Sequence, residues 1–314
     1  MLFVAVVEFP LPDEPQPVFV AAARAAANPR AVFDLIVLSP TSRMLTPMMQ
    51  RTNKNMMIAV SALVLLGGCG SSGGSDNAST SGSTSADAPT PESTGPSALA
   101  PVHGAYSPQI DPANFVSAVD NRYLPYKPGM RWHFTGVAEN GTTPQVDDEL
   151  VTDKTKRILG VDCTVVRDTV TSRGKPVERT FDWYAQDKQG NVWYFGEDAR
   201  DYKHGQFIKA SDSWISGVDG AQPGIAMPAD PQPGDAYRQE YYPKHAEDQA
   251  LVLKGAPAVK VPYASFRQSL TTVERTATEP GVRERKYYAL GVGEIKEEVV
   301  RGSREQIQLV GFSR

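Results

Sequence analysis

One cysteine in this sequence has neighbours that indicate covalent chemistry at its sulfur. The segment Leu66–Cys69 reads Leu-Gly-Gly-Cys and ends an apolar run of 11 residues, Met56–Leu66, which the basic Arg51 and Lys54 precede. Because a helix needs about 20 residues to cross a bilayer, the run fits the apolar region of a cleaved export signal. We predict a lipoprotein signal (a lipobox), in which the Cys69 thiol takes a diacylglycerol and becomes the first residue of the mature chain.

The acyl chains expected on Cys69 imply a location. Two or more chains such as palmitate, at about 0.8 kcal/mol for each buried methylene, hold a protein stably at a membrane. The sequence therefore predicts an extracytoplasmic lipoprotein on the periplasmic or outer face of the cell envelope, with the membrane as its partner. Gly70 leaves the choice between inner and outer membrane open. The alternative is an ordinary signal peptide that a cysteine follows by chance.

Two carboxylates stand at a spacing that could support hydrolysis. Glu178 and Asp182 are four residues apart in a segment with strand character, so their side chains share one face. Glycoside hydrolases need one acid that protonates the leaving oxygen and a second that attacks or activates water. The simpler alternative, which we favour, is a solvated sheet face where these acids pair across strands with Arg167, Lys175 and Arg179.

Aromatic side chains gather around these acids. Trp183, Tyr184, Trp193 and Tyr194 lie on two consecutive predicted strands. Neighbouring strand residues face opposite sides of a sheet, so the four side chains cannot all enter one core. One set must line a second surface, either a cleft inside a curved sheet or a face covered by a loop. We predict that these four residues contact an apolar or glycan ligand.

The remaining chemistry-bearing residues form no recognisable motif. The four histidines lack the spacing of a zinc site, and neither a phosphate-binding loop nor a nucleophile motif is present. We therefore expect no metal and no cofactor. The net charge of −4 argues against a nucleic-acid partner. Cys163 lies in an alternating apolar strand and is expected to be a buried structural thiol.

Composition divides the chain into four parts. Residues 1–47 have no clear period and precede a second candidate initiator methionine, which favours a start codon set too early over a functional N-terminal segment. Residues 48–68 form the predicted signal peptide, and residues 69–100 form a lipidated cysteine with a Gly/Ser/Thr-rich tether that has almost nothing to bury. Residues 101–314 are long enough for one β-rich domain. The sequence does not determine the oligomeric state.

The last part of the chain predicts an all-β fold. Short alternating segments follow one another with hairpin signals between them, among them Ser172–Lys175 and Asp187–Asn191. We expect an antiparallel, strongly curved sheet or an open β-barrel, with one or two short helical turns within 114–119 and 246–251. A long Pro/Gly-rich stretch, Ser216–Gly234, is predicted as a loop across one end of the sheet.

Three sequence blocks resemble a family of bacterial secreted proteins and lipoproteins that has no assigned reaction. The blocks are Asn121–Trp132 (NRYLPYKPGMRW), Asp182–Glu197 (DWYAQDKQGNVWYFGE) and Tyr287–Ile295 (YYALGVGEI). The resemblance covers nearly all of residues 115–312. The resemblance implies an exported location and a β-rich fold, and it brings no ligand and no catalytic residue with it.

These patterns favour a lipid-anchored envelope protein that binds a ligand at its aromatic face and catalyses no reaction. A carbohydrate-active hydrolase that uses Glu178 and Asp182 is the second hypothesis, and a structural or protein-docking component of the envelope is the third. A closed cleft that holds Trp183 or Trp193 would favour binding. Two carboxyl groups about 5–9 Å apart in a groove would favour hydrolysis.

Overall fold

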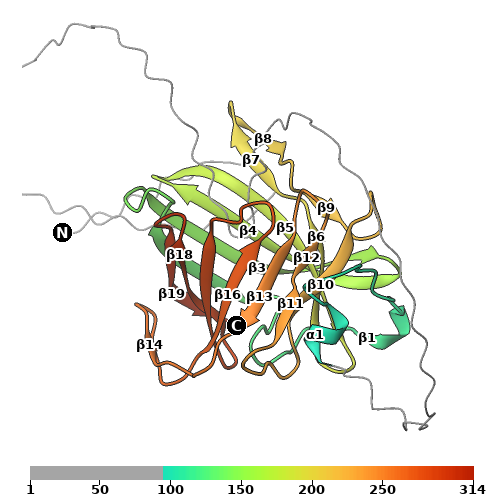
Figure 1. The fold of residues 1–314 in the computed structure, drawn as a ribbon. Coiled ribbons are helices and arrows are strands. Elements are labelled where there is room, and N and C mark those ends of the chain that lie inside the picture. Colours follow the sequence, from blue (N-terminus) through green and yellow to red (C-terminus); the bar gives the residue numbers. More distant parts are fainter. Residues whose placement is uncertain (1–94) are drawn as a thin grey trace, which may run out of the picture. The chain divides into compact units, whose positions relative to one another are not determined.

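The computed structural model describes residues 95–314, which form an antiparallel, strongly curved, barrel-like sheet (Figure 1). The all-β prediction is therefore confirmed. Cys69 and the predicted signal peptide lie outside the described residues. The last residues of the predicted tether are part of the fold, because a helical turn, α1 (Pro96–Leu99), begins there and Ala100 is fully buried. No helix within residues 95–314 is long and apolar enough to cross a membrane.

The first half of the sheet is a meander of long strands. Its members are β2 (Arg131–Val137), β3 (Pro144–Ile158), β4 (Val161–Ser172), β5 (Lys175–Asp187) and β6 (Val192–Glu197). Each strand pairs with the next. The turn between β4 and β5 has positive φ at both Arg173 (52°) and Gly174 (73°), the backbone that matches the twist of paired strands. The hairpin predicted at Ser172–Lys175 is confirmed.

The second half of the sheet is another meander, which joins the first. It comprises β13 (Asp248–Val252), β16 (Leu270–Thr276), β17 (Arg283–Ala289), β18 (Gly293–Arg301) and β19 (Gln306–Ser313). The last of these strands, β19, pairs with β2 along its whole length, so the C-terminal strand lies beside the first long strand. This pairing joins one edge of the first meander to one edge of the second.

Three short strands join the two remaining edges. They are β10 (Gln222–Met227), β11 (Ala236–Arg238) and β12 (Glu240–Tyr241). Strand β10 pairs with β6 on one side and with β12 on the other, and β11 pairs with β13. The strand pairings therefore return to their starting point. The prediction of a loop throughout Ser216–Gly234 is wrong, because β10 lies inside that stretch.

The pairings described so far form a ring of strands, and the remaining elements are short additions to it. They are the 3-10 turn η1 (Pro112–Asn114) and the strands β1 (Phe115–Val116), β7 (Arg200–Lys203), β8 (Gln206–Lys209), β9 (Trp214–Ile215), β14 (Val259–Lys260) and β15 (Ser265–Phe266). The expected helical turns are misplaced. Residues 114–119 include strand β1, which pairs with β5, and residues 246–251 include most of β13. The helical turns lie earlier, where Pro96 and Pro112 begin them.

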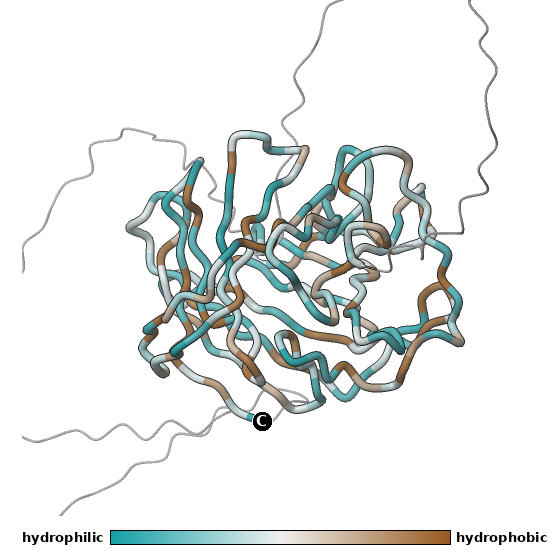
Figure 2. The backbone as a smooth tube through the Cα atoms, turned by 60° about the horizontal axis from the view of Figure 1, so that its bottom comes forward, coloured by the Kyte–Doolittle hydropathy of each residue, from teal (hydrophilic) through white to brown (hydrophobic). Residues whose placement is uncertain are grey.

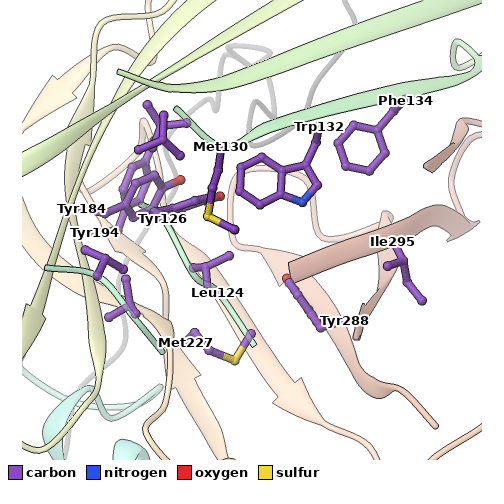
Figure 3. Close-up of a cluster of buried hydrophobic side chains, with 14 of the residues drawn as sticks. Leu124, Tyr126, Met130, Trp132, Phe134, Tyr184, Tyr194, Met227, Tyr288 and Ile295 are labelled. Atoms are coloured by element: carbon purple, nitrogen blue, oxygen red, sulfur yellow. The ribbon is translucent and has the colours of Figure 1, made fainter. Parts of the chain in front are cut away.

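Hydrophobic and hydrophilic residues are interspersed along the strands (Figure 2), and the buried apolar residues form two main clusters. Inside the ring, Trp132 and Phe134 of β2 belong to one cluster with Tyr184 of β5 and Tyr288 of β17 (Figure 3). A second cluster forms on the other face of β4, β5 and β6. It contains Val165, Trp183, Trp193 and Phe195, and the N-terminal residues Ala100, Tyr106 and Phe115 pack there.

We expect Gly224→Ala to destabilise the domain by more than about 2 kcal/mol. A Cβ at this position in β10 would lie 2.2 Å from the carbonyl oxygen of Gln239, where the ring closes, and overpacking of this kind typically costs 1–3 kcal/mol or more. Chemical denaturation measures the effect. The control is Gly281→Ala, because nothing lies within 4 Å of its added Cβ. Equal stability of the two variants would contradict the tight approach at Gly224.

Candidate functional site

A cavity of about 80 Å³ lies inside the ring. Its lining comes from both meanders and from the closing strands, and it is rich in carboxyl groups. The eight acidic lining residues are Glu149, Asp168, Glu178, Asp182, Glu197, Glu240, Asp248 and Glu294. Lys286 of β17 is the one basic residue that the lining contains within residues 95–314. The interior of this ring is therefore acidic where a cavity exists.

The alternation of strand residues brings the acids to one face. Glu178, Thr180, Asp182 and Tyr184 are successive residues of one face of β5, and all four line the cavity. The expectation that Glu178 and Asp182 share a face is confirmed. The solvated-face alternative is wrong, because the two residues are only 5% and 7% exposed.

Neighbouring strands continue the acidic face. Asp168 of β4 pairs in register with Thr180 on one side and with Glu149 of β3 on the other. Directly opposed like charges destabilise a sheet. An acidic ladder of this kind therefore needs protons, cations or hydrogen-bond donors close to it.

The four predicted ligand-contacting aromatics divide between the two faces of the sheet. Tyr184 and Tyr194 line the cavity and stack at a centroid distance of 4.8 Å with 19° between their planes (Figure 3). Trp183 and Trp193 belong to the opposite face, where Phe115 contacts Trp193 edge to face at 6.4 Å. All four are buried. Only the tyrosine pair therefore shares a site with Glu178 and Asp182.

Tyr194 bridges two of the buried acids. Its hydroxyl lies 2.7 Å from Oδ1 of Asp182 and 3.0 Å from Oε2 of Glu197. One hydroxyl supplies one proton, so both contacts are hydrogen bonds only when one of the two carboxyls is itself protonated. Burial, followed by the nearby carboxylates of Glu240 and Asp182, raises the pKa of Glu197 well above its usual value, which favours the protonated form of Glu197.

Lys286 forms a buried charge cluster on the opposite side of the ring. Its Nζ lies 3.2 Å from Glu274, 3.5 Å from Glu297 and 3.7 Å from Glu284. Burial alone would lower the pKa of Lys286, but the three glutamates outweigh it and raise the pKa well above its usual value. Lys286 is therefore charged, and three carboxyl groups already surround it.

Glu240 of β12 has a buried carboxyl group without hydrogen-bond partners in the described structure. It is 1% exposed and lines the cavity, yet neither carboxyl oxygen has a hydrogen-bond partner in the described structure. Oε1 of Glu197 also has no hydrogen-bond partner in the described structure. Burial, then the carboxyls of Asp248 and Asp212, raise the pKa of Glu240 well above its usual value. Sequence reasoning missed Glu240, because no spacing rule links it to β5.

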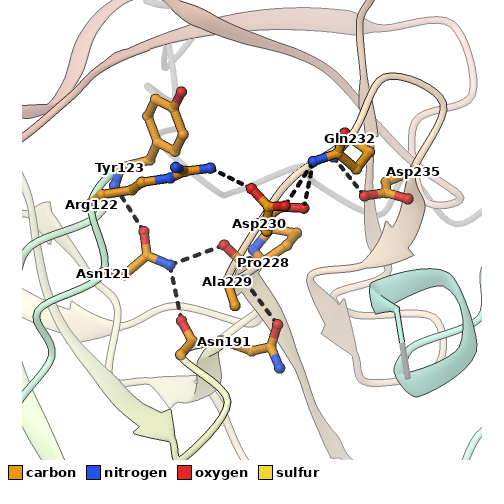
Figure 4. A network of polar contacts seen from close by, with 10 residues as sticks. Asn121, Arg122, Tyr123, Asn191, Pro228, Ala229, Asp230, Gln232 and Asp235 are labelled. Atoms are coloured by element: carbon orange, nitrogen blue, oxygen red, sulfur yellow. Dashed lines mark hydrogen bonds and ion pairs between the residues drawn. The ribbon is translucent and has the colours of Figure 1, made fainter. Parts of the chain in front are cut away.

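A segment before β2 lines the cavity from one side. Asn121 donates to the carbonyls of Gly190 and Pro228, and its Oδ1 accepts from the backbone N–H groups of Tyr123 and Leu124 (Figure 4). These bonds tie the segment to the β5–β6 turn and to the end of β10. As a result, Leu124 and Tyr126 reach the cavity lining.

The surface carries a larger groove near the N-terminal turn. This groove has a volume of about 500 Å³, and its lining includes Leu99, Tyr106 and Trp193. The indole N–H of Trp193 donates to Oδ2 of Asp187 at 2.8 Å. The Trp193 side chain is 6% exposed, so it contributes little free surface to the groove as it stands.

Metal and thiol chemistry find little support in the described part of the chain. No group of three or more His, Cys, Asp or Glu residues within residues 95–314 has an arrangement that could hold a metal ion. Cys163 is fully buried, and burial raises the pKa of its thiol to about 12. A thiol that stays protonated is a poor nucleophile, so the predicted structural role of Cys163 agrees with its surroundings.

Comparison with known proteins gives distant structural neighbours. The sequence matches no protein-family model and no curated protein. A Bacteroides fragilis protein inferred to be exported, with a YmcC-like fold, is 12% identical with a TM-score of 0.37, and the match covers 62% of this chain and 100% of that one. An inferred lipoprotein from Parabacteroides distasonis is 10% identical with a TM-score of 0.30, covering 62% and 99%. Neither description names a ligand or a reaction.

We expect the stability of the domain to fall as the pH rises toward about 8, in part through Glu305. Burial, then the carboxyl of Glu297, raises the pKa of Glu305 to about 8. Between the ordinary glutamate value of about 4.3 and this raised value the folded state holds a proton that the unfolded state releases. Folding stability is thus highest at the acidic end of this window and is lost toward its alkaline end.

Glu305→Gln tests this assignment, because Gln145 Nε2 donates to Oε1 of Glu305 at 3.2 Å and an amide oxygen accepts the same bond. The variant should equal the wild type near pH 4 and exceed it by a few kcal/mol above pH 8, at about 1.4 kcal/mol per pKa unit. Urea denaturation across pH measures the difference. Glu247→Gln, outside the cavity, is the control. Parallel curves for wild type and Glu305→Gln would contradict the raised pKa.

Proposed function

We propose that this protein is a lipid-anchored component of the bacterial envelope that binds a small polar ligand inside its β-ring and does not transform it. The observation that carries the proposal is the internal cavity, where buried carboxyl oxygens of Glu240 and Glu197 face the space without hydrogen-bond partners. Leaving a buried acceptor unpaired costs roughly 1–3 kcal/mol. A ligand that supplies donors there removes that cost, so the empty cavity favours binding.

The anchor rests on the sequence. Leu66–Cys69 follows a short apolar run, and the Gly/Ser/Thr-rich stretch after it contains few residues that a core could bury. An acylated Cys69 would hold the domain at a membrane face outside the cytoplasm. The resemblance to bacterial secreted proteins and lipoproteins points to the same location.

The size of the cavity disfavours glycoside hydrolysis. Because both contact the Tyr194 hydroxyl, Oδ1 of Asp182 and Oε2 of Glu197 are at most 5.7 Å apart, close to the separation of about 5–5.5 Å in retaining enzymes. The cavity of about 80 Å³, however, is smaller than the roughly 150 Å³ that holds benzene. A pyranose unit with its hydroxyl groups has more atoms than benzene, so it does not fit between these acids.

The outer groove supports a second candidate. Its volume of about 500 Å³ and its lining by Leu99, Tyr106 and Trp193 suit an apolar or glycan ligand of the kind the aromatic residues predict. In this case the ligand would lie against the N-terminal turn of the domain, outside the ring. The two candidates place the ligand on opposite faces of β6, which makes them separable by mutation.

We expect Cys69→Ala to abolish lipid attachment. The full chain is expressed in a bacterium fed with labelled palmitate, and the label should enter the wild-type protein and move with the membrane fraction. Cys163→Ala is the matched control and should keep the label, because that thiol is buried in the fold. Equal labelling of Cys69→Ala and wild type would refute the anchor.

We expect the full chain, purified from membranes in mild detergent, to carry a small bound molecule detectable by native mass spectrometry. Ala226→Leu should lose this mass, because Ala226 lines the cavity and a larger side chain fills it. Ala258→Leu is the control, since Ala258 lies in an unrelated surface groove. A mass retained in Ala226→Leu would assign the ligand to the outer groove, and a bare acylated chain in every sample would refute the binding function.

A further inference from the structure

We propose that the ligand of the internal cavity is a small primary amine, bound as its ammonium ion by Glu240 and Glu197. The proposal rests on the proposed function and names the chemical class that the cavity selects. It draws on three separate features of the described residues, which are the type of the unpartnered atoms, the balance of charge, and an ammonium group that the ring already holds.

Several glutamate oxygens in the cavity wall act only as hydrogen-bond acceptors once their carboxyl groups are ionised. They include Oε1 and Oε2 of Glu240 and Oε1 of Glu197, which have no partner in the described structure. A primary ammonium group carries three N–H donors and no acceptor. Anions and carbonyl compounds would add acceptors to a wall that already has an excess of them. The donor-only character of an ammonium group therefore fits these atoms best.

Charge leads to the same class of ligand. Four neighbouring parts of the chain present an acid to Glu240: Asp182 from β5, Glu197 from β6, Asp212 from the segment before β9, and Asp248 from β13. Lys286 is the cation that faces this group, and three other glutamates lie within 4 Å of its Nζ. Adding one ammonium ion to the Glu240 side would let a carboxylate form there without an uncompensated buried charge.

Lys286 shows that this ring holds an ammonium group in its interior. The Lys286 side chain is only 6% exposed, and its Nζ lies 3.2–3.7 Å from carboxyl oxygens of three glutamates. The Glu240 side of the cavity has a similar set of carboxyl groups. Among the described residues that line the cavity, Lys286 is the one that carries an ammonium group, and it lies against the other set of glutamates. The proposed ligand would supply to Glu240 the kind of partner that Lys286 supplies to Glu274.

The cavity volume limits the ligand to a small free amine. About 80 Å³ accommodates several water-sized groups, since each needs about 10–15 Å³ of such space. An ammonium group with one or two carbons fits this volume, whereas a peptide backbone does not. Tetramethylammonium is excluded twice, because it is bulkier and because it has no N–H group to donate.

Binding should release protons. Before the amine enters, burial and the neighbouring carboxyl groups raise the pKa values of Glu197 and Glu240 and so favour their protonated forms. An ammonium ion stabilises the ionised carboxylate beside it, so a proton passes from the carboxyl group to the buffer. The amine therefore exchanges for a proton, and its affinity should rise with pH as long as the amine itself stays charged.

Isothermal titration calorimetry of the full chain in detergent, at constant ionic strength, tests the assignment. Methylammonium and ethylammonium chloride are the probes, and tetramethylammonium chloride is the size and donor control. We expect saturable binding of at least one primary amine, no binding of the control, and heats that differ between Tris and phosphate buffers because a proton is released. Glu240→Gln should weaken binding at least about tenfold.

Two further variants make the outcome decisive. Glu247→Gln removes a carboxylate from the β12–β13 turn outside the cavity lining and should bind the amine as the wild type does. If Glu240→Gln does not fold, Glu197→Gln serves instead, since its amide oxygen can still accept from Tyr194. Absence of amine binding by the wild type, or wild-type affinity in the folded cavity variant, overturns the amine assignment.

The two levels of the proposal fail differently. A co-purifying mass that Ala226→Leu removes, together with no response to either amine, leaves the cavity as a binding site and rejects only the amine. Absence of both the mass and the amine response rejects the binding function as well.

Discussion

Carboxyl groups crowded into a space with little water are the constraint on which the interior of this domain depends. A buried carboxylate without a partner is expensive, and a group in that situation shifts its pKa and takes up a proton instead. Two kinds of interaction stabilise the buried carboxyl groups of the ring. On one side Lys286 supplies a charge to Glu274, Glu284 and Glu297. On the other side protons and the Tyr194 hydroxyl must suffice.

The apolar packing that stabilises the fold adjoins this polar interior, and Tyr184 and Tyr288 belong to both. Trp132, Phe134, Ile295 and Leu309 fill the part of the ring built by β2, β18 and β19. A second apolar cluster lies on the opposite face of β5 and β6, beneath the N-terminal residues. Hydrophobic burial on both sides of the sheet can therefore offset the cost of the acids between them. Loss of either cluster would leave the acidic ladder of β3, β4 and β5 without support.

Local patterns in the sequence were enough to predict the strands and their faces. The period of two along β5 placed Glu178, Asp182 and Tyr184 on one side and Trp183 on the other, as the structure has them. The hairpin at Arg173–Gly174 was equally readable, since its positive φ values belong to a common two-residue turn. These features depend only on neighbouring residues, which is why one sequence carries them.

Features that depend on contacts between distant parts of the chain could not be predicted from local sequence patterns. Strand β10 was hidden in a Pro/Gly-rich stretch, because Gly224 is needed there for close approach to the Gln239 carbonyl and not for a turn. Glu240 gave no signal, since its significance arises only when β12 lies beside β10 and its side chain meets acids of β5 and β6. The solvated-face interpretation of Glu178 failed for the same reason. Whether a sheet face meets water or its own opposite wall depends on ring closure.

The composition of the cavity is easier to understand as a binding device than as a stabilising one. Replacing buried ionisable groups by well-packed apolar residues is often neutral or stabilising, so stability alone gives no reason for Glu240 to be an acid. Glu240 is only 1% exposed and its two oxygens have no partner in the described structure, which lowers the stability of the fold. The proposed ligand would provide hydrogen-bond donors and recover this energy on binding, and the recovered energy would add to its affinity. A buried acid without partners at the wall of a small cavity therefore fits the proposed selectivity for a cation.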